Sequence, residues 1–294
     1  MMKFLFAFII ASAPLYGQGT SAGMGSLKLP VEARSGALGG ATIADISPTS
    51  FATNPALLSD ASGLTFSLSH QNWIQDIHTE AFFSIVPVSF GTLGFSVSST
   101  NIPGIELREV PGPSLGEFTA RSAIFRGTAS IRLAPDISAG LSLNYLYEKI
   151  LVDDANGVGV DLGVSYTPSI EGSRVGISLL HVGSMNRFRT ERGPLPTTLA
   201  LGASYGLSFD EFSVLVLGSQ LFELQEHHAP LRAGLEASFL DSFRIRLGYQ
   251  SGQEARGVSY GVGVFYAGIN FDYAYVPFSY DLGNAHLITL GLSL

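Results

Sequence analysis

From about residue 62 to the C-terminus, apolar residues alternate with small or polar residues in a period of two. Leu141, Leu143 and Tyr145, for example, alternate with Ser142 and Asn144. This period is typical of β-strands whose two faces meet different surroundings. Because no convincing amphipathic helix interrupts the series, the sequence predicts an all-β fold.

The alternation predicts about fourteen strands, an even number that suits an antiparallel barrel. The predicted strands span residues 63–70, 79–86, 91–100, 118–133, 137–148, 158–167, 174–183, 198–207, 211–218, 230–239, 243–250, 257–266, 268–276 and 286–294.

The connections between these strands alternate in length along the chain. The stretch 71–78 is long and 87–90 is short, and the long stretch 101–117 precedes the short stretch 134–136. Outer-membrane barrels combine tight periplasmic turns with longer outer loops, whereas a soluble β-sandwich has no reason to do so. The sequence therefore predicts a transmembrane antiparallel β-barrel with both termini on the periplasmic side. The alternative is a soluble sandwich or barrel whose apolar face points inward.

The composition agrees with a membrane barrel. Only 14% of the 294 residues are charged, and 46% are hydrophobic. The chain also contains 34 glycines. A strand face that meets lipid carries little charge, and glycine suits narrow lumen positions and tight turns. The absence of cysteine excludes a disulfide scaffold and a thiol nucleophile, and the net charge of −8 argues against nucleic-acid binding.

The N-terminus resembles an export signal. Lys3 precedes an apolar run over residues 4–13, which suits the core of a signal peptide and is too short to span a bilayer. We expect a signal peptide over residues 1–18, with cleavage after Ala13 or nearer Gly17–Gly19; the alternative is a buried N-terminal helix. Since no later segment contains 18 consecutive apolar residues, the sequence excludes a helical membrane protein.

Several charged residues fall on the polar face of the predicted strands. We expect their side chains to point into the lumen, where a polar ligand or partner group would be met. They are Arg132, Asp161, Arg244 and Arg246.

Two local patterns suggest chemistry that their context does not favour. Residues 202–206 match the G-x-S-x-G pattern of serine hydrolases, but they lie within an alternating strand that no helix follows. Glu223, Glu226, His227 and His228 could bind a divalent cation, although a solvated loop is the preferred interpretation. The sequence therefore predicts no catalytic residue, no metal site and no cofactor.

The segment before the barrel carries two motif blocks. The first contains Leu29-Pro30, Ala33-Arg34 and Ala37-Leu38-Gly39-Gly40, and the second reads Asn54-Pro55-Ala56-Leu57-Leu58. Together they resemble the N-terminal signature of the PorV/PorQ family of outer-membrane proteins, most closely its PorQ branch. Weaker similarity continues through the strands over nearly the whole mature chain.

This resemblance implies a FadL-like barrel of fourteen strands over residues 63–294. It also implies that residues 19–62 form a short segment in or under the barrel, like a hatch. The motif residues then have structural or ligand-contact roles. They are Pro30, Arg34, Gly39, Gly40, Asn54, Pro55 and Ala56. A buried Arg34 would need a carboxylate partner, which the sequence does not identify.

The resemblance also implies a function without catalysis. Members of the family are associated with type IX secretion, so we expect an outer-membrane accessory protein that anchors partners of a secretion or attachment complex. The alternative is a FadL-like transporter that admits a hydrophobic small molecule. The expected contacts are outer-membrane lipid, protein partners and a possible hydrophobic ligand, and no nucleic acid.

Overall fold

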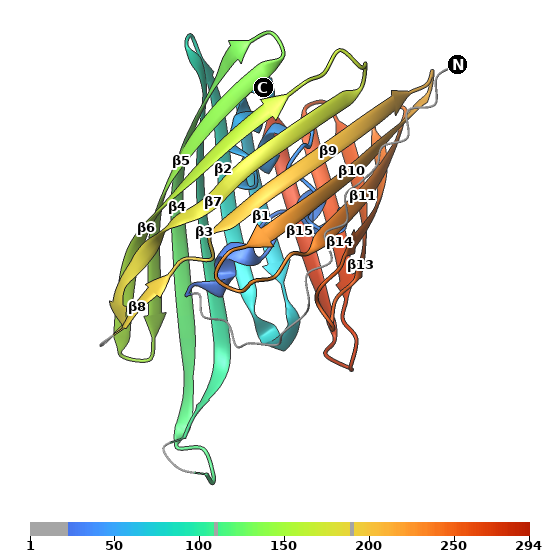
Figure 1. Cartoon of the computed structure of the whole chain (residues 1–294). Coiled ribbons are helices and arrows are strands. Elements are labelled where there is room, and N and C mark those ends of the chain that lie inside the picture. Colours follow the sequence, from blue (N-terminus) through green and yellow to red (C-terminus); the bar gives the residue numbers. More distant parts are fainter. Residues whose placement is uncertain (1–22, 109–110, 189–190) are drawn as a thin grey trace.

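The computed structural model describes residues 23–108, 111–188 and 191–294, and almost all of its regular structure is β. Figure 1 shows the strands arranged as the wall of a barrel. The strands are β1 (Thr65–Asn72), β2 (His78–Val88), β3 (Gly91–Leu107), β4 (Gly116–Ala134), β5 (Ile137–Ile150), β6 (Asp153–Tyr166), β7 (Ser173–Phe188), β8 (Glu191–Pro194), β9 (Thr198–Ser208), β10 (Phe212–Glu223), β11 (Leu231–Phe239), β12 (Phe243–Gln250), β13 (Val258–Tyr266), β14 (Ile269–Pro277) and β15 (Asn284–Ser293).

The sheet closes on itself. Successive strands pair antiparallel, and the first strand pairs with the last, so that Leu68 of β1 lies opposite Leu290 of β15. The short strand β8 pairs only with the far end of β7, while β7 also pairs with β9. The wall therefore consists of fourteen strands, as the alternation predicts.

The two ends of the barrel differ, and we name them by their connections. The short-turn end contains the turns 89–90, 135–136 and 240–242, and the long-loop end contains the connections 224–230 and 251–257. The long connection over residues 149–157, predicted between the strands 137–148 and 158–167, is wrong: β5 and β6 extend until only Leu151 and Val152 separate them. Extended strands thus replace loop on this side of the barrel.

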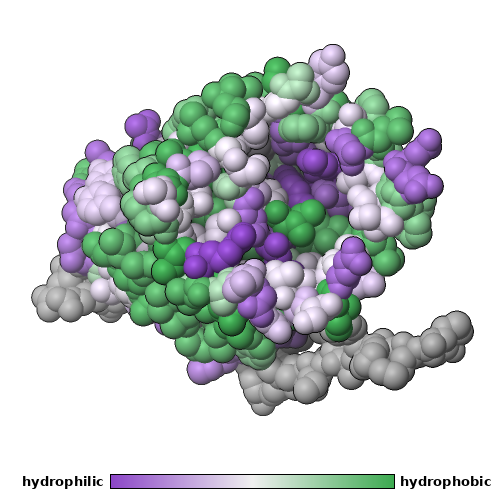
Figure 2. Space-filling view, turned by 90° about the horizontal axis from the view of Figure 1, so that it is seen from above, coloured by the Kyte–Doolittle hydropathy of each residue, from purple (hydrophilic) through white to green (hydrophobic). Residues whose placement is uncertain are grey.

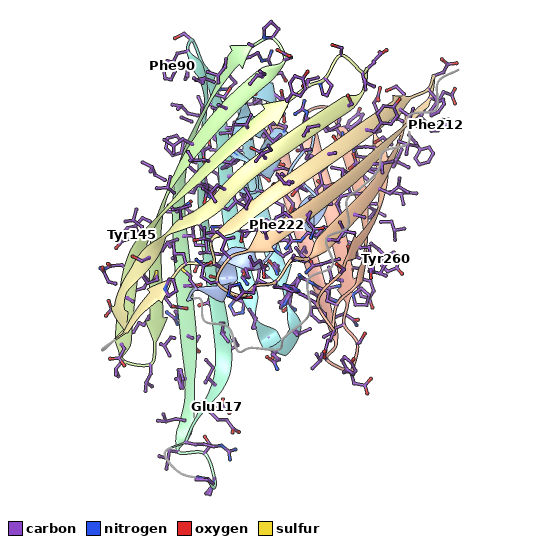
Figure 3. The ribbon with its side chains drawn as sticks, viewed as in Figure 1. Phe90, Glu117, Tyr145, Phe212, Phe222 and Tyr260 are labelled. Carbon is purple, nitrogen blue, oxygen red and sulfur yellow. The ribbon has the colours of Figure 1, made fainter. Side chains whose placement is uncertain are left out.

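The apolar residues of the wall point outward. Leu143 is 57% exposed and Ile245 is 58% exposed, whereas the alternating Ser142 and Asn144 are buried. Tyr145 and Tyr260 also project from the outer surface in Figure 3. Figure 2 shows hydrophobic residues around the periphery and polar residues gathered in the opening. This inside-out arrangement excludes the soluble sandwich with an apolar core.

Residues 23–64, which we call the plug, run through the lumen. The plug contains the short helices η1 (Gly25–Lys28), α1 (Ala33–Ala37), η2 (Pro48–Ala52) and η3 (Pro55–Asp60). It begins at the long-loop end, where the Gly23 amide donates to the Pro194 carbonyl. It leaves at the short-turn end, where the Leu294 amide donates to the Leu64 carbonyl. The described helices include none that is both long and apolar enough to cross a membrane.

The position of both termini on the periplasmic side stays a prediction. The predicted signal peptide, residues 1–18, lies outside the described residues. The first described residue, Gly23, lies at the end of the barrel opposite to that of the C-terminal residue Leu294.

Glycines on the inner wall make room for the plug. At each of eight positions, a Cβ atom would meet plug atoms closer than ordinary van der Waals contact allows. These glycines are Gly94, Gly140, Gly163, Gly176, Gly202, Gly234, Gly248 and Gly261. They come from eight different strands, so the plug is fitted against most of the circumference. The high glycine content of the chain therefore has a structural use that periodicity alone does not reveal.

A valine at Gly140 tests this fit. Its Cβ would lie 2.6 Å from the Ala56 amide nitrogen and nearer still to Pro55, so the plug backbone must shift. We expect Gly140→Val to lower the unfolding free energy by about 1–3 kcal/mol, the usual range for overpacking. The measurement is a denaturant titration in phospholipid vesicles.

Gly127→Val is the matched control on the neighbouring strand, because a Cβ at Gly127 meets nothing within 4 Å. Equal losses in the two variants would show that the plug is not in contact with Gly140.

Candidate functional site

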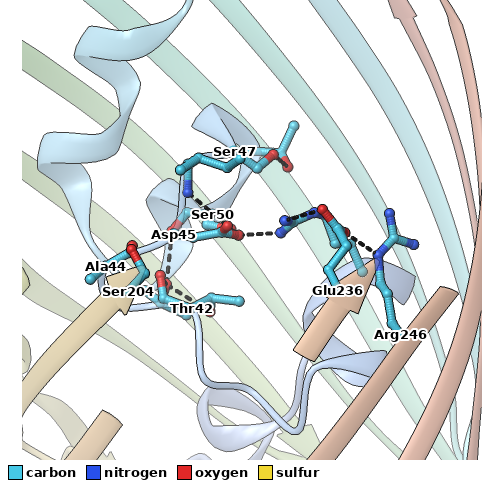
Figure 4. Close-up of polar contacts among 12 residues, drawn as sticks. Thr42, Ala44, Asp45, Ser47, Ser50, Ser204, Glu236 and Arg246 are labelled. Atoms are coloured by element: carbon cyan, nitrogen blue, oxygen red, sulfur yellow. Dashed lines mark hydrogen bonds and ion pairs between the residues drawn. The ribbon is translucent and has the colours of Figure 1, made fainter. Parts of the chain in front are cut away.

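A cluster of buried charges joins the plug to the wall. Arg34 of the plug pairs with Asp45, also of the plug, and its Nη2 lies 3.2 Å from Glu236 Oε1 on β11. Arg246 of β12 lies 2.5 Å from both Glu236 Oε2 and Asp272 Oδ1. We call these five residues the charge cluster; Figure 4 shows its contacts around Asp45, Glu236 and Arg246. Asp45 and Glu236 are the carboxylate partners that a buried Arg34 requires.

The helix α1 positions Arg34 within this cluster. Its small residues Ala33 and Ala37 are fully buried and pack in a cluster with Ala274 and Leu287 of the wall. The wall also satisfies both ends of the helix: the Ala33 amide donates to Thr289 Oγ1 at 2.9 Å, and Ser259 Oγ donates to the Ala37 carbonyl at 3.0 Å. Small side chains and external hydrogen bonds therefore let a helix of five residues exist inside the barrel.

The second motif block is fixed by Asn54. Its side-chain oxygen accepts from the Ala56 amide at 3.1 Å and so caps η3. Its Nδ2 donates to the Ile43 carbonyl at 2.8 Å and to the Val164 carbonyl of β6 at 3.2 Å. Asn54 thus joins two parts of the plug to the wall, and Pro55 lies against Gly140.

The glycine pair of the first block forms the turn after α1. Gly39 has φ +63° and Gly40 has φ +74°, a region that favours glycine. A Cβ at Gly39 would lie 2.8 Å from the Tyr249 amide nitrogen. The turn therefore also has no room for a side chain at this position. Pro30 lies further towards the long-loop end and lines the cavity described below.

The four lumen charges all lie on the inner face, but they fall into different groups. Arg246 belongs to the charge cluster, and Arg244 lies beside it with its guanidinium 5.8 Å from the Phe265 ring. Arg132 is 56% exposed near the short-turn end, where its Nη2 donates to the Ser59 carbonyl at 3.3 Å. Asp161 takes part in a second buried network.

This second network depends on a β-bulge that the alternation does not predict. The register of β6 and β7 shifts there, and His181 takes φ +58°. The His181 amide donates to Asp161 Oδ1 at 2.7 Å, while Asn144 Nδ2 donates to Asp161 Oδ2 at 2.8 Å. Arg126 completes the group, since its Nε donates to Asn144 Oδ1 at 2.7 Å.

The loop cluster at residues 223–228 holds the plug. Lys28 Nζ lies 3.2 Å from Glu223 Oε2 and 2.6 Å from Glu226 Oε1. His228 Nδ1 lies 3.1 Å from the same Glu223 oxygen. Within the part of the chain that the structure describes, no group of three or more His, Cys, Asp or Glu side chains could hold a metal ion. Lys28 is therefore the cation that this loop binds.

The G-x-S-x-G pattern also has a structural place. Ser204 lies on β9 and its Oγ donates to the Ala44 carbonyl of the plug at 2.6 Å. Its hydroxyl is thus another contact between wall and plug, with no helix after the strand.

A cavity lies between the plug and the wall on the long-loop side. The space in it that the centre of a water molecule can occupy is about 110 Å³, and the cavity is partly open to solvent. Its apolar lining includes Leu27, Leu29, Val31, Ile43 and Phe83. Its polar lining includes Lys28, Glu32, Arg126, His181, Glu223, Arg232, Gln250 and Arg256. Most of the accessible surface of the lining is apolar, although many of the lining residues are polar or charged. Small-molecule sites combine apolar surface with placed polar groups in this way.

Comparison with known proteins gives the fold. No family model matches the chain, and no curated protein matches its sequence. Among solved structures, the CymD monoaromatic hydrocarbon channel matches with a TM-score of 0.61 and 15% identity, covering 90% of this chain and 97% of that one. The toluene transporter TodX of Pseudomonas putida matches with a TM-score of 0.57 and 12% identity over 88% and 96% of the chains.

A FadL homologue of Pseudomonas aeruginosa matches with a TM-score of 0.55 and 11% identity, over 90% of this chain and 98% of that one. The chain has the fold of the FadL-like channels. At these identities the likeness concerns the fold alone. The resemblance to the PorV/PorQ family receives no support from the comparisons and stays a prediction from the sequence.

Glu32 connects the cavity to the charge cluster. Burial raises the pKa of Glu32 to about 8. A hydrogen bond from Thr49 and the charge of Arg34 lower this pKa, whereas the charges of Asp272 and Asp45 raise it further. A carboxyl with this pKa is largely protonated at neutral pH. Its protonation suits a cluster that already contains more carboxylates than guanidinium groups.

The raised pKa of Glu32 predicts a pH dependence. The unfolded chain releases this proton near pH 4.5 and the folded protein near pH 8, so stability falls as the pH rises between these values. Glu32→Gln should remove this slope, which is at most about 1.4 kcal/mol per pH unit. Unfolding titrations from pH 5 to 8.5 measure the difference from the parent protein.

Glu211→Gln, in an exposed turn, is the control and should leave the slope unchanged. A parent protein whose stability tracks that of Glu32→Gln at every pH would contradict the buried, protonated state.

Arg34→Ala tests the charge cluster. It leaves the Asp45 and Glu236 carboxylates buried without their shared cation, so we expect a loss of about 3–5 kcal/mol in unfolding free energy. Arg121→Ala, at an exposed position of β4, should change it by less than about 0.5 kcal/mol. A similar small loss for Arg34→Ala would mean that the plug does not depend on the cluster.

Proposed function

We propose that this protein is a channel for hydrophobic small molecules in a bacterial outer membrane. The observation that carries the proposal is the largely apolar cavity between the plug and the barrel wall. Two of the similar structures, CymD and TodX, are described as a monoaromatic hydrocarbon channel and a toluene transporter. An outward apolar surface on a closed barrel suits insertion into lipid.

The two ends of the barrel favour one orientation in the membrane. In outer-membrane barrels the short turns face the periplasm and the longer loops face outward. The cavity then opens towards the outside, and the plug separates it from the periplasm. A hydrophobic solute would enter the cavity from the long-loop side and pass to the periplasm only after part of the plug moves.

The plug also explains why such a channel need not leak ions. Its residues Phe51, Leu57 and Leu58 are fully buried against the wall, and wall glycines fit its backbone closely. No part of this function requires catalysis.

A reversible lock on the plug tests this proposal. Cβ atoms at Gly36 and Ala274 would lie 3.7 Å apart, which suits a disulfide, and the natural chain has no cysteine. In the Gly36→Cys/Ala274→Cys variant we expect oxidation to slow toluene uptake into proteoliposomes at least about tenfold, as for a gate held shut. Reduction should restore the rate.

Thr65→Cys/Ser293→Cys is the control, since its disulfide would join β1 to β15 without touching the plug. Uptake that is equally fast with the Gly36–Ala274 disulfide fully formed would contradict transport past the plug.

A second candidate function is the anchoring of partner proteins at the cell surface, as the PorV/PorQ resemblance implies. It is favoured by the β3–β4 hairpin, which extends beyond the rest of the barrel at the long-loop end and carries Glu117 near its tip (Figure 3). Leu115 is exposed on this extension, and Ile102 is exposed at its base. Such an extension offers edges and apolar groups to a protein partner.

Replacement of residues 103–119 by a two-residue Asn-Gly turn tests this second candidate. The wall below Ile102 and Ala120 keeps its pairing, so the barrel should still fold and transport. Anchoring predicts that secretion-complex proteins co-purify with the parent protein and are lost from this variant. Equal recovery of the same proteins with both would count against it.

A further inference from the structure

Two arginines in the cavity have no carboxylate partner among the described residues. Arg232 lies on β11 and Arg256 in the β12–β13 connection, and neither forms an ion pair. By contrast, Lys28 and Arg126, which line the same cavity, both pair with carboxylates. Buried guanidinium groups are normally paired, so this pair of arginines requires an explanation.

Gln250 lies beside both arginines. Arg232 lies directly opposite Gln250 across the β11–β12 pairing, and Arg256 Nη2 donates to Gln250 Oε1 at 2.8 Å. The Arg256 guanidinium also lies over the Trp73 ring, 5.1 Å from its centroid. Arg232 donates to the Gly40 carbonyl of the plug at 3.4 Å, and its charge acts on Arg256. Both arginines line the cavity.

Each of these three side chains has an N–H group without an acceptor. The unpartnered atoms are Arg232 Nε, Gln250 Nε2 and Arg256 Nε, and all three are inaccessible to solvent. Gln250 is 5% exposed, Arg256 is 9% exposed, and Arg232 is partly buried. Burial, followed by the nearby charge of Arg232, lowers the pKa of Arg256 to about 10, so it remains charged at neutral pH. The site thus contains donors and positive charge in excess.

The carboxylates of the cavity do not compensate this excess. The charge of Glu223 acts on Arg232, but Glu223 forms its ion pairs with Lys28 and His228. Glu32 holds its proton at neutral pH. The missing component is therefore an acceptor with negative charge. Two guanidinium groups and an amide fit the oxygens of a carboxylate or phosphate, which accept charge-assisted hydrogen bonds from arginine.

We propose that Arg232, Gln250 and Arg256 form a binding site for an oxyanion, a carboxylate or phosphate group. The cavity beside the site is apolar at Leu29 and Val276. If the proposed transport function holds, on which this part of the inference rests, the oxyanion is the head group of a hydrophobic molecule. A free inorganic anion has the same recognition chemistry.

The chain provides its own probe of this site. Trp73 is the single tryptophan of the sequence, and Arg256 contacts its ring. Fluorescence in a non-ionic detergent therefore reports an anion that binds next to Arg256. The titrants are decanoate, the neutral analogue decanol, and inorganic phosphate.

We expect a saturable change of Trp73 emission with decanoate and none with decanol. Arg232→Gln leaves the Arg256–Trp73 contact in place and should weaken decanoate binding about tenfold to a hundredfold, the usual effect of losing hydrogen bonds to a charged group. Arg121→Gln should bind decanoate like the parent protein. Decanoate that binds more tightly than phosphate identifies a hydrophobic ligand with an anionic head group, whereas phosphate that binds at least as tightly identifies a free anion.

Thermal unfolding of Arg256→Gln gives a second measurement. Without anion, this variant should unfold no earlier than the parent protein, because it removes a buried, uncompensated charge. Added anion should raise the transition of the parent protein and not that of the variant.

The oxyanion site is refuted if neither decanoate nor phosphate changes Trp73 emission. It is also refuted if decanol acts as decanoate does, or if Arg232→Gln leaves both anion affinities unchanged. Failure of the transport proposal is distinct, because toluene uptake by proteoliposomes is measured without any anion.

Discussion

The pairing of charges inside the lumen is the constraint on which the rest of this structure depends. Arg34 and Arg246 are buried, and a buried guanidinium is tolerated only with hydrogen-bonded carboxylates around it. Glu236 contacts both arginines, so one carboxylate of the wall ties the plug to β11 and β12. A plug that left the lumen would separate these charges. The paired charges and the apolar contacts of the plug with the wall therefore fix its resting position together.

The wall and the plug are shaped for each other. The outer face of the barrel uses large apolar residues, while the inner face provides glycine at eight positions where the plug comes close. Polar side chains of the wall, such as Ser204, Ser259 and Thr289, satisfy backbone groups of the plug. The plug has only short helices, and these wall contacts supply hydrogen bonds that its own structure lacks. Neither part would keep this arrangement without the other.

The sequence predicts the barrel well because successive side chains of a strand point to opposite faces, one towards lipid and one towards the lumen. Alternation gives the fourteen strands of the wall and places Arg132, Asp161, Arg244 and Arg246 on the inner face. It fails at His181, where one bulged residue shifts the register, since nothing in the local pattern marks a bulge. It also misses the extension of β5 and β6 to a two-residue turn.

The site is harder to predict because its partners are distant in the chain. Arg34 meets Glu236 across 202 residues, and Lys28 meets Glu223 across 195 residues. Periodicity indicates which face a side chain occupies but not what lies opposite it inside a closed barrel. The loop residues Glu223 and His228 therefore resemble a cation site in the sequence, although Lys28 supplies the positive charge in the structure.

Hydrogen–deuterium exchange of the intact protein in lipid nanodiscs tests most directly that the plug is held in the lumen. The amides of Gly36, Leu38 and Gly40 donate to carbonyls within the plug, and the surrounding residues are buried. We predict that these amides exchange as slowly as those of the barrel strands. Exchange as fast as in the loop 224–230 would contradict the central claim.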